Sequence, residues 1–146
     1  MILIIPDIHG RNFWKKIRNQ LNGDIILIKG NHDQKNMSTT AEQELFKHVT
    51  WQMLIEVEGR KVLLNHFPFL CYAGVYREPK KLVYQCYGHV HSGPDKKGQD
   101  LPRLVHTYPM QYDVGVDNNN YEPISWEELN TKIQLQLLKS KYNVKE

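Results

Sequence analysis

Histidine, asparagine and aspartate side chains follow four apolar segments of this 146-residue chain, in four short motifs. These motifs are Asp7-Ile8-His9, Gly30-Asn31-His32-Asp33, Asn65-His66 and Gly88-His89-Val90-His91. Imidazole nitrogens combined with carboxylate and amide oxygens suit divalent ions such as Mn, Fe, Zn and Ni, whereas oxygen ligands alone suit Ca or Mg. The residue types therefore predict a site for a divalent transition metal ion.

The segments in front of the motifs are predicted to be buried strands. Ile2 to Ile5 and Ile25 to Ile28 are short apolar runs, and the residues between them have apolar side chains at helical spacing from Phe13 to Leu21. This pattern predicts a β-α-β unit with parallel strands. Open α/β sheets place their sites just beyond the carboxyl ends of the strands, so we expect the four motifs to meet in one crevice.

The remaining elements are predicted from periodicity and capping signals. We expect a helix from Thr40 to Val49, begun by a capping box of Thr39 and Glu42, and a helix after the capping box of Ser125 and Glu128. Strand-like patterns predict a hairpin and three further strands: 53–57 with 61–64, then 82–87, 104–107 and 113–116. One domain spanning residues 1–146 accounts for all of them.

In this order the motifs resemble those of the calcineurin-like metallophosphoesterase family. The resemblance runs from Met1 to about His91, and residues 114–117 and 123–125 resemble the end of small bacterial and phage members. It implies an α/β fold, the metallophosphoesterase-like αββα sandwich, in which two mixed β-sheets are flanked by helices. Here the fold would be trimmed by one strand unit.

The resemblance also implies a role for each motif residue. One metal ion would be bound by Asp7, His9 and His91, and a second by Asn31, His66 and His89. His32 would donate a proton to the leaving oxygen, and Asp33 would orient His32. Apart from the resemblance, the position of Arg11 just after the first motif indicates a contact with the substrate phosphate, which Asn31 would also contact. A surface salt bridge is an equally good interpretation of Arg11.

The implied activity is hydrolysis of a phosphomonoester or phosphodiester by a metal-activated hydroxide, with two divalent ions (Mn, Fe, Zn or Ni) as cofactors. The substrate would be a phosphate-ester small molecule or a nucleotide. The alternative is a catalytically weakened domain that binds a phosphate-containing ligand or nucleotide without turnover. Substrate assays with added Mn separate the two.

One carboxylate of the family pattern is missing. The family has a further strand ending in Gly-Asp, whose carboxylate bridges both metals, whereas this chain passes directly from the first helix to the Gly30-Asn31-His32-Asp33 strand. Asp24 precedes that strand and is expected about 20 Å from Asn31, so it cannot be the bridge. Asp33, Asp95, Asp113 and Asp117 are conceivable substitutes. With one carboxylate fewer, we expect weaker metal binding and partial occupancy.

Composition narrows the class of protein. A net charge of +3 and 24% charged residues describe a mixed-charge surface better than a nucleic-acid groove, so a nucleic-acid partner is not indicated. No apolar run is long enough to cross a bilayer, and the apolar start from Met1 to Ile5 lacks a basic leader. We therefore expect a cytoplasmic protein with reduced Cys71 and Cys86.

Overall fold

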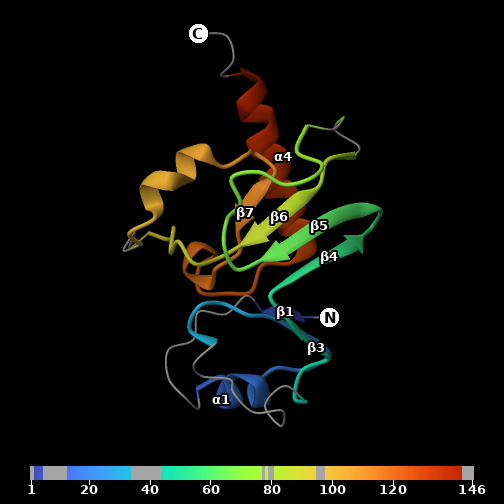
Figure 1. The fold of residues 1–146 in the computed structure, drawn as a ribbon, viewed down its shortest axis with the longest axis vertical. Coiled ribbons are helices and arrows are strands. Elements are labelled where there is room, and N and C mark those ends of the chain that lie inside the picture. Colours follow the sequence, from blue (N-terminus) through green and yellow to red (C-terminus); the bar gives the residue numbers. More distant parts are fainter. Residues whose placement is uncertain are drawn as a thin grey trace.

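The computed structural model describes residues 2–4, 13–33, 44–76, 78, 81–94 and 98–142. It is an α/β structure with two β-sheets (Figure 1). In the first sheet, the order is β1 (Ile2–Ile4), β2 (Ile25–Ile28) and β3 (His48–Thr50). In the second sheet, the order is β4 (Gln52–Val57), β5 (Arg60–Asn65), β6 (Tyr84–Tyr87) and β7 (Gln111–Asp113).

Helices lie beside both sheets. The helix α1 (Phe13–Gln20) lies next to the first sheet, and α4 (Trp126–Tyr142) runs along the second (Figure 1). Two 3-10 helices, η2 (Leu101–His106) and η3 (Val116–Asn118), flank β7 in the chain. No helix within the described ranges combines the length and apolar character needed to span a bilayer.

The strand β2 is the centre of the first sheet and is buried along its whole length. Ile26 and Ile28 join a core formed with residues of the second sheet and of α4, while Ile25 and Leu27 pack with Phe46 in a separate cluster. Burial on both faces is typical of a central parallel strand, and parallel pairing of β2 with β1 confirms the predicted β-α-β unit. The residues that follow β2 therefore extend from a strand that is buried and paired with a neighbouring strand.

The second sheet brings two of the sequence motifs to one edge. β4 and β5 form the predicted antiparallel hairpin, closed by Glu58 and Gly59 with φ values of 50° and 77°. Positive φ at both turn residues is the requirement of a type I′ hairpin. β5 and β6 then pair in parallel, so the residues that follow both strands leave the sheet on the same side.

The helix predicted from Thr40 to Val49 is wrong over its described part. Residues 44–47 form a turn, and His48–Thr50 is the strand β3, parallel to β2. The backbone of this segment bonds to its neighbours, since Lys47 N donates to Ile25 O at 2.8 Å and Leu45 O accepts from Arg18 Nε at 2.8 Å. A free edge of β2 thus outweighs local helical spacing. Thr39 and Glu42 lie outside the described residues.

Three further expectations need correction. Residues 104–107, predicted as a strand, belong to η2, which has a proline in its first turn, where the fixed φ favours a helical start. The strand predicted at 113–116 is shifted, because β7 ends at Asp113 and Val116 begins η3. The first sheet is not mixed, because all its described pairs are parallel; only the second sheet is mixed.

The predicted capping box of α4 is confirmed. Ser125 Oγ accepts from Glu128 N at 3.2 Å, and Glu128 Oε2 accepts from Ser125 N at 3.0 Å. Leu129 and Ile133 then face the core, with Leu137 partly buried. The hydrogen bonds from the Ser125 backbone and hydroxyl lower the pKa of Glu128 below its usual 4.5.

We expect Ser125→Ala to lower the free energy of unfolding by about 1 kcal/mol, because two of the cap hydrogen bonds are lost. The Glu128 contribution is present above pH 4.5 and disappears as pH falls through its lower folded-state pKa. Urea denaturation of both proteins at several pH values measures this. Thr131→Ala, in the middle of the same helix, is the control and should change stability less. Equal losses in both variants would contradict the capping role.

Candidate metal centre

The side chain of Asn31 is the meeting point of three of the predicted ligands. Asn31 follows β2 in the first sheet, while His66 and His89 follow β5 and β6 in the second. His66 Nε2 lies 2.8 Å and His89 Nδ1 lies 3.2 Å from Asn31 Oδ1. Three residues that are far apart in the sequence are thus brought into one cluster, as the placement of the motifs predicts.

These distances fit a shared divalent ion. Two ligand atoms that each lie about 2.1 Å from a metal, at right angles to one another, are about 3.0 Å apart. The observed 2.8 Å and 3.2 Å bracket that value. One amide oxygen and two imidazole nitrogens are also the donor set that suits Mn, Fe, Zn or Ni. The Asn31, His66 and His89 side chains therefore fit one half of the expected metal centre.

The backbone at His89 has an uncommon conformation. His89 has a φ of 69°, and Val90 N donates to Gly88 O at 2.8 Å, which closes a three-residue γ-turn around His89. A γ-turn with positive φ is rare and strained, and such strain is concentrated at functional sites. Gly88 N also donates to His66 O at 3.0 Å, which ties the turn to the end of β5. This turn aims the His89 ring at Asn31.

An aromatic contact limits the motion of the two histidine rings. The Phe67 ring centroid lies 4.9 Å from that of His66 and 4.7 Å from that of His89, in edge-to-face geometry. Buried Gln85 fixes the Phe67 segment, because its Nε2 donates to Phe67 O at 3.0 Å and its Oε1 accepts from Phe69 N at 3.1 Å. The histidine orientations therefore depend on packing as well as on the strand ends.

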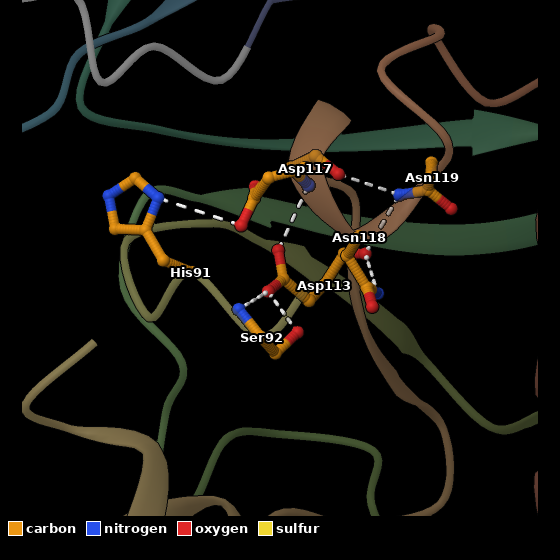
Figure 2. A network of polar contacts seen from close by, with 7 residues as sticks. His91, Ser92, Asp113, Asp117, Asn118 and Asn119 are labelled. Carbon is orange, nitrogen blue, oxygen red and sulfur yellow. Dashed lines mark hydrogen bonds and ion pairs between the residues drawn. The ribbon is translucent and has the colours of Figure 1, made fainter. Parts of the chain in front are cut away.

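A carboxylate lies against each histidine of the Gly88-His89-Val90-His91 motif. Asp100 Oδ2 is 3.3 Å from His89 Nε2, on the opposite side of the ring from Asn31. Asp117 Oδ2 is 3.6 Å from His91 Nδ1, and Figure 2 shows the two side chains facing each other. In metal sites, a carboxylate behind a histidine ligand fixes the tautomer and the direction of the ring.

Asp113, one of the candidates for the missing bridging carboxylate, is buried and has other partners. Its Oδ2 accepts from Ser92 Oγ at 2.5 Å, and its Oδ1 accepts from Gly115 N at 2.9 Å (Figure 2). Its backbone oxygen accepts from the side-chain amides of Asn118 and Asn119. Asp113 thus joins the His91-Ser92 segment to the loop that carries Asp117.

The other predicted site residues have mixed outcomes. Asp7, His9, Arg11 and Asp95 lie outside the described residues. Asp33 is fully buried, and its Oδ2 accepts from Gly30 N at 2.7 Å, so its carboxylate stabilises the turn that presents Asn31. His32 lies between them and is partly exposed. The expected orientation of His32 by Asp33 stays a prediction.

Two observations bear on the carboxylate count. Asp24 precedes β2, as expected, and binds Lys47 Nζ at 2.6 Å, so the hydrogen bond and charge of Lys47 lower the pKa of Asp24. Within the described ranges, no group of three or more His, Cys, Asp and Glu side chains is arranged to bind a metal. The cluster around Asn31 has only two such side chains and completes its donor set with an amide.

Comparison with known proteins identifies a structural neighbour. The chain is similar to AQ665 of Aquifex aeolicus, a protein of unknown function with a crystal structure, at a TM-score of 0.52 and 24% sequence identity. The match covers 85% of this chain and 69% of AQ665. No protein-family model and no curated protein matches the chain. The likeness to AQ665 shows a shared fold.

Sequence reasoning missed Asp100 altogether and assigned Asp117 only as a possible bridge. Neither residue belongs to one of the four motifs. A signal for Asp100 existed in the glycine two residues before it, because a glycine often marks a close approach of two backbone segments.

Proposed function

We propose that the chain is a divalent-metal-dependent phosphoesterase with a metallophosphoesterase-like αββα arrangement. The observation that carries the proposal is the convergence of His66 Nε2 and His89 Nδ1 on Asn31 Oδ1 from strands of two different sheets. Packing alone does not require three ligand-type side chains to meet at the carboxyl ends of three strands. The order of the four sequence motifs, and the α/β fold with two sheets, support the same proposal.

In this proposal, residues of the chain bind the metal ions, contact the substrate and donate a proton to the leaving oxygen. Asn31, His66 and His89 bind one metal ion, and Asp7, His9 and His91 bind the second. Bound divalent ions supply a nucleophile near neutral pH and stabilise the charge that develops on the phosphoryl oxygens. His32, next to Asn31 in the chain, protonates the leaving oxygen. Arg11 contacts a substrate oxygen through its planar guanidinium group.

A specific observation favours the alternative, a domain that binds a phosphate-containing ligand with little turnover. Three candidates for the missing bridging carboxylate have other partners: Asp33 accepts from Gly30 N, Asp113 accepts from Ser92 and Gly115, and Asp117 faces His91. Fewer carboxylates between the ions means weaker metal binding in the resting protein.

The experiment measures hydrolysis of an aryl phosphate monoester and an aryl phosphate diester with added Mn. We expect turnover by the unmodified protein, and a loss of kcat of about 100-fold or more in His32→Ala, because a general acid contributes about that much. The matched control is His48→Ala. His48 is an exposed histidine at the amino end of β3, paired in register with Ile26 and away from the carboxyl ends of the strands.

The outcomes separate the two functions. Turnover that is lost in His89→Ala and kept in His48→Ala supports the enzyme. Absence of turnover in the unmodified protein, together with phosphate binding that survives His32→Ala, would support the binding domain instead. Equal turnover in all variants would mean that the activity does not come from this site.

A further inference from the structure

We propose that Asp100 and Asp117 are positioning residues for the metal centre and that each fixes the orientation of one histidine. Together they supply negative charge in place of the bridging aspartate of the family pattern. This inference rests on the proposed phosphoesterase site. It assigns a function to two carboxylates that lie beyond the four motifs. Each acts through a histidine and does not bind the ion itself.

The hydrogen-bonding capacity of His89 carries the first step. Acceptor oxygens face both of its ring nitrogens: Asp100 Oδ2 at 3.3 Å from Nε2 and Asn31 Oδ1 at 3.2 Å from Nδ1. A neutral imidazole donates from one nitrogen only, and a carboxylate can only accept. In the neutral ring, Asp100 holds the proton on Nε2, and the lone pair of Nδ1 is directed at Asn31 Oδ1, where a cation bound by both atoms would replace the contact between two lone pairs.

The Asp100 side chain does not cap the helix that follows it. Asp100 precedes η2 as the N-cap residue, yet its side chain makes no capping hydrogen bond. Its second oxygen, Oδ1, lies 3.2 Å from Arg103 Nε, so the two carboxylate oxygens are divided between Arg103 and His89. Arg103 is mostly exposed, which limits the strength of that ion pair.

Asp117 has the same relation to His91. Its Oδ2 lies 3.6 Å from His91 Nδ1, and Figure 2 shows the carboxylate beside the His91 ring. Asp117 is in η3, whose start is fixed by Asp113: Gly115 N donates to Asp113 Oδ1, and Asn118 Nδ2 donates to Asp113 O. The segment that carries Asp117 is therefore held by a partly buried network.

Two glycines permit both approaches. A Cβ atom added at Gly98 would lie 1.9 Å from Val90 O, between the two histidines, and one added at Gly93 would lie 2.1 Å from Asp117 O. In proteins, a Cβ atom essentially never lies within 3.0 Å of a heavy atom outside its own residue and the two neighbouring residues. The segment that carries Asp100 touches Val90, and the segment that carries Asp117 touches Gly93, each at a position where only glycine fits.

The electrostatic consequence concerns the missing carboxylate. A bridging aspartate would reduce the formal charge of a two-ion centre by one, and each outer carboxylate does the same from a longer distance. Carboxylates behind histidine ligands also increase the basicity of the rings. Asp100 and Asp117 thus lower the cost of gathering two divalent ions in a site that has few direct carboxylates.

The test compares Asp100→Asn and Asp117→Asn with Asp24→Asn, which removes the same charge from an exposed ion pair with Lys47. Calorimetric titration with Mn is expected to show affinities about 10- to 100-fold weaker for the first two variants. The Asp24→Asn control should bind Mn within about twofold of the unmodified protein, because a surface pair contributes little. Mn affinity unchanged in both site variants overturns the inference.

A second measurement is independent of metal. Long-range proton-nitrogen NMR of the metal-free protein should show the neutral His89 ring protonated on Nε2, and Asp100→Asn should shift it toward protonation on Nδ1, because an amide can donate to Nε2. An unchanged ring in Asp100→Asn contradicts the positioning role. If the unmodified protein fails to bind Mn, the proposed function and the charge role fall, and a ring that still responds to Asp100 supports positioning alone.

Discussion

Replacing Asn31 with alanine is expected to weaken Mn binding by about 100-fold or more and to remove the proposed phosphoesterase activity. The change deletes the oxygen on which His66 and His89 converge, at 2.8 Å and 3.2 Å. Loss of a partner behind one ligand already costs about 10- to 100-fold, so loss of the shared ligand atom should cost at least the upper value. Calorimetry with Mn, followed by turnover of an aryl phosphate, measures both effects.

Asn31→Asp is the matched variant. It keeps an oxygen in the same place and adds the negative charge that the site lacks, so we expect Mn affinity at or above that of the unmodified protein. Because Asn31→Ala removes a hydrogen-bond partner of the buried His66, metal-free stability should fall by about 1 to 3 kcal/mol, whereas Asn31→Asp keeps an oxygen there and should change stability less. Equal Mn affinity in the alanine variant and the unmodified protein would show that Asn31 is not a ligand.

Replacing Gly98 with alanine is expected to lower the free energy of unfolding by about 1 to 3 kcal/mol, the usual cost of forcing an extra carbon into a packed contact. The new Cβ atom would meet Val90 O, a backbone atom that cannot move without displacing the neighbouring histidines. Asp100 lies two residues further along the chain, so Mn affinity should fall together with stability. Urea denaturation and calorimetry on the same preparation test both.

Gly59→Ala is the control for that experiment. Gly59 has a φ of 77° in the β4–β5 turn, and an added Cβ atom there meets nothing within 4 Å. Alanine at positive φ costs about 1 to 2 kcal/mol, so stability should fall while Mn affinity stays unchanged. If Gly98→Ala loses stability and keeps full Mn affinity, then the approach of residues 98–100 to Val90 serves the fold and not the metal site.

Local signals predicted the elements whose sequence and surroundings agree. The turn of Glu58 and Gly59, the capping box of Ser125 and Glu128 and the buried run of β2 are each specified by a few neighbouring residues. The segment around Val49 differs because its apolar spacing is compatible with both helix and strand. Its conformation was decided by an open edge of β2, which lies more than twenty residues away in the chain and which no local pattern reveals.

The candidate site also has one part that local sequence signals predicted and one part that they did not. Asn31, His66 and His89 were predicted because each follows an apolar strand, and strand ends gather at one edge of a sheet. Asp100 and Asp117 were not predicted as histidine partners, since their positions depend on how η2 and η3 return to the histidine turn. That return depends on close backbone contacts at Gly98 and Gly93, which only coordinates reveal.

The two sheets contribute unequally to the cluster around Asn31, and this has a mechanical consequence. Asn31 extends from the first sheet, whereas His66 and His89 extend from the second. An ion bound by all three side chains would cross-link the two sheets and would oppose their separation during unfolding. Mn should therefore raise the melting temperature by an amount that grows with the logarithm of its concentration divided by its Kd, and a chelator should reverse that gain.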